Sequence, residues 1–173
     1  NDAPIANDVT ASTTSRTGNM RQSVDITLSV TDADGDDLTI SIVSDVSNGT
    51  TSLSGSTVTY TPTANYDGTD TFTYKANDGS LDSNTATATV TVAAVNDTPV
   101  TSDQTASTNE DTAVDITLES TDPDTGDTIT YSIVSDVSNG STSLSGSTVT
   151  YTPDTNWNGT DTFTYKANDG DED

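Results

Sequence analysis

Aspartate is concentrated in short polar segments that occur twice along the chain. The segment TDADGDD at 31–37 has a counterpart, TDPDTGD, at 121–127, and Asn-Asp pairs stand at 1–2 and 96–97. The 173 residues include 25 Asp but only 3 Glu. The short Asp side chain caps turns and presents oxygen to hard cations, and Ca²⁺ takes about six to eight oxygen ligands. These segments therefore indicate calcium binding.

Other chemistry is restricted by what the sequence lacks. With no Cys and no His, the chain has no disulfide, no thiol nucleophile and no imidazole base or zinc ligand. A net charge of −24 with four Lys and Arg repels phosphates, so nucleic acid is excluded as a partner. No apolar run approaches the ~20 residues of a membrane span, so no membrane insertion is expected. Carboxylate pairs suit glycosidase chemistry by residue type, but they lie in repeated loops without sign of a single cleft, and no enzyme is expected.

Long stretches of the sequence occur twice. Residues 42–62 return at 133–153 with one change, and GTDTFTYKANDG stands at both 68–79 and 159–170. A spacing of about ninety residues indicates tandem modules, here 1–95 and 96–173. Near-identical copies in tandem are typical of a stalk, spacer or multivalent binder rather than of an enzyme.

The apolar pattern predicts strands throughout. Only 29% of the residues are apolar, which with the high charge would favour disorder, but strict alternation overrules that average. Val24, Ile26 and Leu28 share one face of a strand, and residues 86–92 alternate apolar side chains with Thr. Seven such strands in about 95 residues predict an all-β fold of two tandem immunoglobulin/cadherin-like Greek-key β-sandwiches. The second copy has no counterpart of residues 84–92 and is expected to lack its last strand.

The loops of such a sandwich gather at its two ends. We expect the end of the first module to meet the start of the second, so that the carboxylates of both form a calcium site there. Without a cation, carboxylates so close together would repel one another. The residues expected there are Asp67, Asp70, Asn96, Asp97, Asp122, Asp124 and Asp169. Their first-module equivalents are Asp2, Asp32, Asp34 and Asp78. The alternative is an acidic, solvated end whose Asp side chains only cap turns.

The motifs together resemble a known family. Ala-Asn-Asp-Gly at 76–79, an alternating final strand and then Asn-Asp-x-Pro at 96–99 look like the end of a cadherin repeat. TDADGDDLTISIV and TDPDTGDTITYSIV resemble the cadherin Asp-x-Asp segment and the strand after it. The chain is most similar to the bacterial cadherin-like repeats of giant calcium-dependent adhesins, the biofilm-associated and RTX-type surface proteins. That resemblance implies an extracellular place on a bacterial surface and adds Glu110 as a calcium ligand.

The resemblance is incomplete at two places. The first module has an insertion at 13–23 where the second has Glu110, and neither has the cadherin Asp-Arg-Glu motif. The insertion is interpreted as a longer surface loop, with a partner contact as the alternative.

The predicted function is a non-catalytic, calcium-stiffened extender that acts in cell adhesion or biofilm, with neighbouring repeats of the same polypeptide as its main partners. One alternative is a glycan-binding module that uses Trp157 or Tyr66. Another is a filament subunit in which another copy donates the missing strand. A halophile-type acidic surface is a further alternative.

Overall fold

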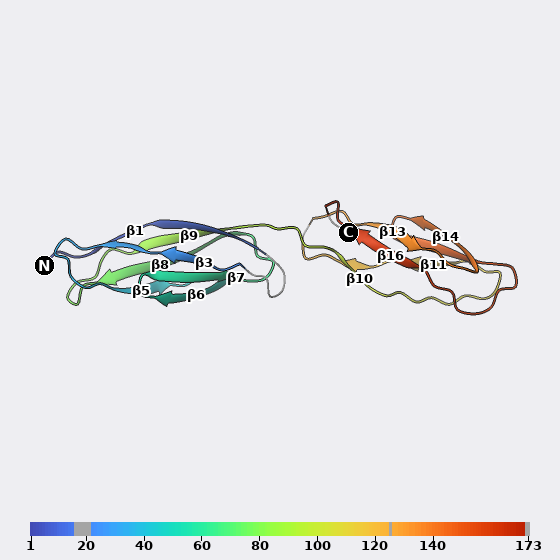
Figure 1. Cartoon of the computed structure of the whole chain (residues 1–173), viewed down its shortest axis with the longest axis horizontal. Coiled ribbons are helices and arrows are strands. Elements are labelled where there is room, and N and C mark those ends of the chain that lie inside the picture. Colours follow the sequence, from blue (N-terminus) through green and yellow to red (C-terminus); the bar gives the residue numbers. More distant parts are fainter. Residues whose placement is uncertain (16–21, 125, 172–173) are drawn as a thin grey trace. The chain divides into compact units, whose positions relative to one another are not determined.

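The computed structural model of the chain describes residues 1–15, 22–124 and 126–171. The chain divides into two compact units, Asn1–Val95 (unit 1) and Asn96–Asp173 (unit 2), and both are built from β-strands (Figure 1). No helix in the described part of the chain is long and apolar enough to cross a membrane. Arg16, Met20 and Arg21, which distinguish the insertion at 13–23, lie outside the described residues.

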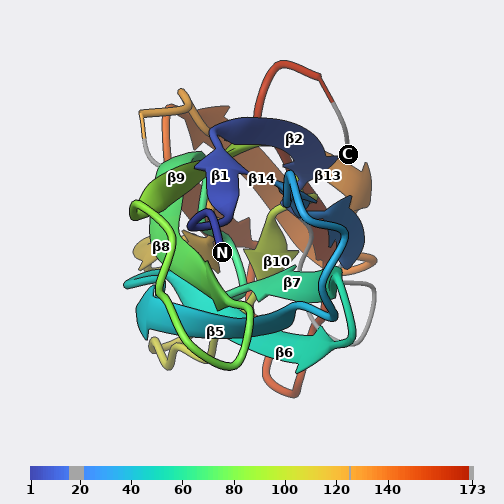
Figure 2. The ribbon, with the colours of Figure 1, turned by 90° about the vertical axis from the view of Figure 1, so that its left-hand side faces the viewer.

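Unit 1 is a two-layered sandwich. Its strands are β1 (Ile5–Asn7), β2 (Val9–Thr14), β3 (Val24–Thr27), β4 (Ser29–Thr31), β5 (Thr39–Ser44), β6 (Gly49–Ser54), β7 (Thr57–Pro62), β8 (Gly68–Asn77) and β9 (Ala86–Ala93). One sheet has the order β2-β9-β8-β5, the other β3-β7-β6, and β1 pairs with β4. Strand β2 runs parallel to β9, and all other pairs in unit 1 are antiparallel. Figure 2 shows β8 and β9 in one layer and β6 and β7 in the other.

The core of unit 1 lies between these layers. Successive side chains of a strand point to opposite faces, so alternating residues of β7, β8 and β9 fill it. Tyr60, Phe72, Tyr74 and Val90 have no exposed surface. Lys75, between Tyr74 and Ala76 on β8, points outward and forms an ion pair of 2.6 Å with Asp82. The predicted alternation is confirmed here.

Unit 2 repeats most of this arrangement. Its strands are β10 (Val100–Thr101), β11 (Val114–Thr117), β12 (Ser120–Thr121), β13 (Thr130–Ser135), β14 (Gly140–Ser145), β15 (Thr148–Pro153) and β16 (Thr164–Asn168). One sheet has the order β11-β15-β14, and β13 pairs with β16 as β5 pairs with β8. No strand in the described part of unit 2 corresponds to β9 or β2. Two tandem sandwiches, the second without its last strand, are thus confirmed.

The missing strand has a visible local effect. The sequence GTDTFTYKAN forms all ten residues of β8 in unit 1, but in unit 2 only its last five residues form β16. In unit 1, β9 pairs with β8 from Gly68 to Tyr74 and with the whole of β2. Because a strand needs a hydrogen-bonded neighbour, the absence of β9 accounts for the shortening of β16 and for the lack of a β2 counterpart.

Candidate metal centre

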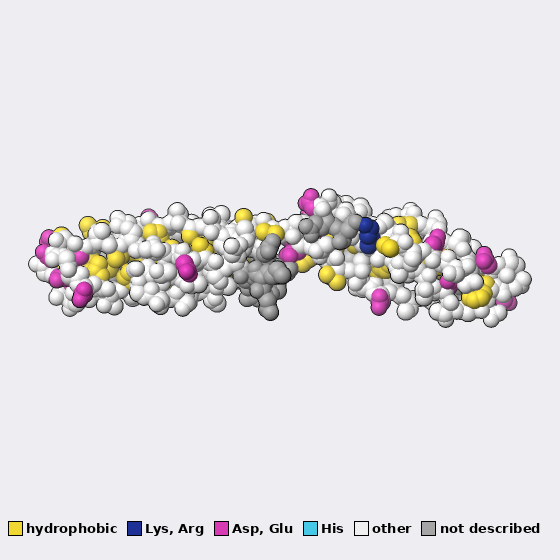
Figure 3. Space-filling model, in the orientation of Figure 1, with side chains coloured by type: hydrophobic (Ala, Val, Ile, Leu, Met, Phe, Trp, Pro, Cys, Tyr) yellow, Lys and Arg dark blue, Asp and Glu magenta, His cyan; other side chains and the backbone are white. Residues whose placement is uncertain are grey.

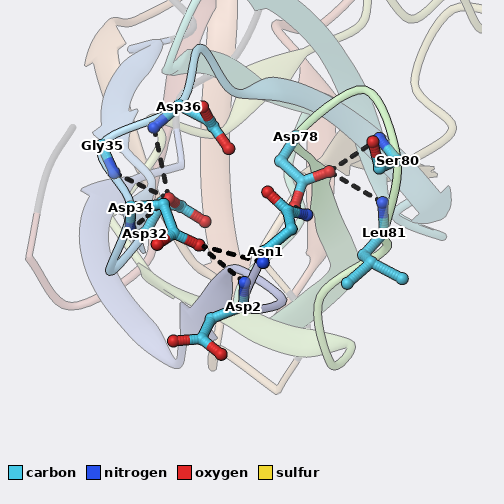
Figure 4. A network of polar contacts seen from close by, with 9 residues as sticks. All are labelled: Asn1, Asp2, Asp32, Asp34, Gly35, Asp36, Asp78, Ser80 and Leu81. Carbon is cyan, nitrogen blue, oxygen red and sulfur yellow. Dashed lines mark hydrogen bonds and ion pairs between the residues drawn. The ribbon is translucent and has the colours of Figure 1, made fainter.

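A loop between β4 and β5 brings three carboxylates of unit 1 together. One oxygen each of Asp32, Asp34 and Asp36 lies within 4.8 Å of the others. Asp32 Oδ1 accepts hydrogen bonds from the backbone N–H groups of Asp34, Gly35 and Asp36, at 2.9, 2.9 and 3.2 Å (Figure 4). Gly35 has φ of +80°, a backbone conformation that favours glycine. The loop therefore curls around the Asp32 carboxylate.

The loop between β12 and β13 builds the same cluster in unit 2. Oxygens of Asp122, Asp124 and Asp127 lie within 4.8 Å of one another. Asp122 Oδ1 accepts a hydrogen bond of 2.8 Å from the N–H of Asp124. The two clusters arise from different loop sequences, since unit 2 has one residue more before its Gly-Asp pair. Their agreement indicates a feature of the module rather than of one copy.

One oxygen of each central carboxylate is buried without a partner. Asp32 Oδ2 and Asp122 Oδ2 are closed off from solvent and accept no hydrogen bond from the described residues. A buried carboxylate oxygen without a donor or cation is costly, about 1–3 kcal/mol or more. Both units leave the equivalent oxygen in this state while the other oxygen binds backbone amides. A cation ligand needs such an oxygen, one that no N–H group already uses.

The first two residues of each unit are hydrogen-bonded to its Asp-rich loop and to an Asp just after β8 or β16. In unit 1 the N–H of Asp2 donates to Asp34 Oδ2 at 2.6 Å, and the Asn1 amide donates to Asp78 Oδ2 at 2.9 Å (Figure 4). The Asp2 carboxylate itself is directed away from the loop in Figure 4. Unit 2 has the same pair of bonds, at 2.6 and 2.8 Å, from Asp97 to Asp124 and from Asn96 to Asp169. The predicted residues of each module thus meet within that module.

The electrostatics around these clusters favour a positive charge. Loss of solvation, followed by the negative charges of Asp122, Asp124, Asp169 and Asp171, raises the pKa of the Asp127 carboxyl. Backbone N–H groups of Leu81 and Ser80 act in the opposite direction on Asp78 and lower its pKa. Figure 3 shows several acidic side chains at the end of unit 1 that carries the N-terminus. A divalent cation would remove the repulsion that Asp127 experiences.

The remaining predicted ligands lie elsewhere. Asp67 is exposed on the loop before β8, and Glu110 is exposed in a turn of unit 2. Asp70 is only 4% exposed, and its oxygens accept N–H groups of Ser47 and Asn48 at 3.1 and 2.8 Å. These oxygens therefore have a role inside unit 1 that needs no cation. A meeting of Asp67 and Asp70 with unit 2 stays a prediction.

Two members of the clusters were missed by the sequence analysis. Asp36 and Asp127 each follow a Gly in the Asp-rich loop, and the aligned Gly-Asp pair in both copies was the available signal. Only the turn at Gly35 and Gly126 brings the third carboxylate back toward the first two.

Asp70 is expected to stabilise unit 1 even without calcium. In Asp70→Asn an amide group would replace one oxygen that now accepts a hydrogen bond, so at least one of the two N–H donors would lose its partner or meet another donor. We expect a loss of about 2–3 kcal/mol in the free energy of unfolding, measured by urea denaturation in chelator. Asp67→Asn, exposed on the loop just before β8, is the matched control and should change it by less than about 0.5 kcal/mol. Equal losses from both would contradict this role.

Comparisons with known proteins agree with the fold. A family model described as "Bacterial Ig domain" matches residues 1–92 and again 96–173. No curated protein matches the chain.

Among solved structures, Drosophila N-cadherin EC1-4 is 20% identical, with a TM-score of 0.54 over 94% of this chain and 44% of that one. Extracellular cadherin domains 3-6 of protocadherin gamma B2 are 16% identical, with a TM-score of 0.52 over 87% of this chain and 38% of theirs. An endo-fucoidan hydrolase of glycoside hydrolase family 107 is 20% identical over 97% of this chain and 27% of that one, at a TM-score of only 0.45. The chain thus spans less than half the length of each of these structures.

Domains of this family are typically non-catalytic. Since the family model covers both units almost completely, the chain belongs to the bacterial Ig domains, of which it contains two in tandem.

Proposed function

We propose that the chain is an extracellular, non-catalytic extender segment of a bacterial adhesin, and that each unit binds Ca²⁺ at its Asp-rich loop. The observation that carries the proposal is the buried, unpartnered carboxylate oxygen of Asp32 and of its equivalent, Asp122. Two loops of different sequence leave the same oxygen without a donor, and a cation is the simplest group that would satisfy both.

Calcium fits this donor set better than other metals. Every candidate ligand is an oxygen, and Ca²⁺ prefers carboxylate, carbonyl and water oxygens in a flexible shell. Mg²⁺ demands near-octahedral geometry and keeps most of its water. A loop with three close carboxylates, two of which already accept backbone N–H groups, does not favour such a shell. Zn²⁺ prefers His and Cys, which the sequence does not contain.

Stiffening would act through the start of each unit. Asn96 and Asp97 follow β9 after only Ala94 and Val95, and both are hydrogen-bonded to carboxylates of unit 2. A cation on Asp122 and Asp124 would hold in place the carboxylate that accepts the Asp97 N–H. Such a bound ion would thereby restrict the movement of Ala94 and Val95, which join the two units. Extracellular Ca²⁺ would also favour the folded state, whereas low calcium would leave the units looser before export.

Glycan binding has less support. Stacking on sugars needs an exposed aromatic face, but Tyr66 and Trp157 are both half-buried. Each ring folds back over a nearby glycine: a Cβ on Gly68 would lie 3.3 Å from the Tyr66 hydroxyl, and one on Gly159 would lie 2.8 Å from the Trp157 ring. Both side chains thus cover turns of their own unit.

Calcium titration by calorimetry tests the site. In Asp32→Ala the loop of unit 1 loses its central ligand, and Asp122→Ala does the same in unit 2. Each variant should lose the binding events of one unit, or bind there at least about tenfold more weakly, and the double variant should lose both. Asp45→Ala, in a loop away from the clusters, should titrate like the unchanged chain. Equal effects of all three single variants would show that the ligands lie elsewhere.

A further inference from the structure

The outer edge of β5 in unit 1 is open. In the sheet of order β2-β9-β8-β5, β5 is the last strand and pairs with β8 alone among the described residues. Edge strands are commonly blocked by Lys or Pro, but residues 38–44 contain no Pro and no charged side chain. A β-bulge lies only toward the end of the strand, between Ile42 and Ser44. The backbone groups of residues 39–42 on this edge can therefore pair with a further strand.

A groove lined by apolar side chains lies beside this edge. It has a volume of about 520 Å³, and its lining includes Val30 of β4, Leu38 and Ile40 at the start of β5, and Leu53 of β6. Val30, Ile40 and Leu53 pack against the core of unit 1 but are only partly buried. The groove lies where β5 and β6 approach the same margin of the sandwich (Figure 2). A strand paired with β5 would place every second side chain over it.

Acidic side chains flank the open edge. Asp37 stands before β5 and Asp45 directly after it, and both are exposed. Asp45 Oδ1 accepts hydrogen bonds from the Val46 N–H and the Thr51 hydroxyl, at 2.8 and 2.7 Å, whereas its Oδ2 accepts none from the described residues. In the described part of the chain, neither carboxylate forms an ion pair with Lys or Arg. The two ends of this neutral strand therefore attract positive charge.

We infer that the open edge of β5 binds an extended polypeptide segment with apolar side chains at alternate positions and Lys or Arg at both ends. The apolar side chains lie over the groove, opposite Leu38, Ile40 and Ile42. The basic side chains face Asp37 and Asp45, which stand at the two ends of a stretch of roughly 25 Å, at about 3.3 Å per residue. Backbone pairing supplies affinity, and the apolar and basic positions supply specificity.

A second copy of the chain fits this edge less well. Two β5 strands paired antiparallel about Ser41 would place Asp37 of one copy opposite Asp45 of the other, and like charges directly opposite are destabilising. With a net charge of −24 each, two copies also repel as a whole, whereas a basic segment is attracted. The partner is therefore a different polypeptide. This inference concerns strand addition and does not depend on calcium.

Unit 2 has a weaker version of the same site. Its β13 pairs with β16 alone among the described residues, so the other edge of β13 is open. Thr128 stands where unit 1 has Asp37, and Tyr131 stands where unit 1 has Ile40. The Tyr131 hydroxyl lies 2.9 Å from the Ser120 hydroxyl of β12, so its ring reaches across the space that corresponds to the groove. Unit 1 is therefore the preferred site.

The test uses a synthetic peptide, KTTVTVTVK, with blocked termini. It carries Val opposite the inward positions 38, 40 and 42 of unit 1 and Lys at both ends, and it is added to the whole chain in saturating Ca²⁺. Amide hydrogen exchange should show at least about tenfold more protection at alternate residues of 39–43, because the other amides already bond to β8. Residues 130–134 of unit 2 should gain less. The peptide DTTVTVTVD is the control and should protect neither stretch.

The variant Asp37→Lys tests the charged flank. Asp37 is exposed and lies outside the cluster of Asp32, Asp34 and Asp36, so the fold and that cluster are kept. The variant should bind KTTVTVTVK at least about fivefold more weakly, because one end of the peptide then meets a like charge. Asp103→Lys makes the same change in net charge at an exposed position of unit 2 and is the matched control, which should bind like the unchanged chain.

Three results would overturn the inference: no new protection at saturating peptide, equal protection by DTTVTVTVD, or equal weakening by both Lys variants. Sedimentation of the same samples shows whether copies of the chain associate. A dimer whose residues 39–43 are protected before any peptide is added would also overturn it, because a second copy then occupies the edge. A monomer that gains protection only with the Lys peptide supports the inference.

Discussion

Unit 2 is expected to unfold at a lower temperature than unit 1. The four inward side chains of β9, two Ala and two Val, contribute on the order of 5 kcal/mol of apolar burial at about 25 cal/mol per Å². That is comparable with the net stability of a whole domain, about 5–15 kcal/mol. Unit 2 has no counterpart of these side chains among its described residues, and its Phe163 and Tyr165 are half-buried as a result.

Two probes separate the units during melting. The only Trp of the chain, Trp157, lies in unit 2, so its fluorescence follows that unit, while calorimetry follows both. We expect two calorimetric transitions, with the fluorescence change at the lower one. A single transition that both probes share would contradict the prediction.

A completed variant tests the cause. A copy of residues 80–93 is placed directly after Gly170, where the repeat pattern would continue. The temperature of the transition that fluorescence reports should then rise toward the melting temperature of unit 1. The same extension with Asp at the positions of Ala88 and Val90 is the control and should not change the temperature of this transition. If the unsubstituted extension has no effect, the sandwich of unit 2 closes without this strand.

Removal of calcium is expected to lower the melting temperature of both units. A ligand that binds only the folded state at 100 times its dissociation constant stabilises it by about 2.7 kcal/mol. For a domain of this size that corresponds to a shift of about 10–20 °C. Without the ion, three carboxylates within 4.8 Å of one another repel, and the buried Asp32 and Asp122 oxygens have no partner.

The measurement compares melting with EGTA, with Ca²⁺ added back, and with Mg²⁺ at the same concentration. Calcium should restore the original temperature, and Mg²⁺ should restore little of it. The Asp32→Ala variant should lose the response of unit 1 alone, and Asp122→Ala that of unit 2 alone. Small-angle scattering of the same samples should show a more compact or more variable particle in EGTA. Unchanged melting and unchanged scattering after chelation would refute the calcium proposal.

Much of the fold could be predicted from local patterns. Alternation of apolar residues with Thr identifies strands wherever one face is buried, and β7, β8 and β9 follow it. The Asp-x-Asp segments likewise identified Asp32 and Asp34, since a short loop holds such close residues together in nearly any fold. Asp36 was not predicted because its carboxylate comes close to those of Asp32 and Asp34 only through the positive φ of Gly35.

By itself, the sequence determined the two modules, their strands and the Asp-rich loops, because these depend on residues close together in the chain. Only the tertiary structure decided the hydrogen-bond partners and the secondary structure of residues that depend on distant neighbours. Asp70 is a predicted metal ligand, but its carboxylate accepts hydrogen bonds from the N–H groups of Ser47 and Asn48. The identical stretches GTDTFTYKAN form a complete strand beside β9 and half a strand in unit 2, where the described residues include no such neighbour. A strand is completed by hydrogen bonds to another segment, so its own residues cannot specify it alone.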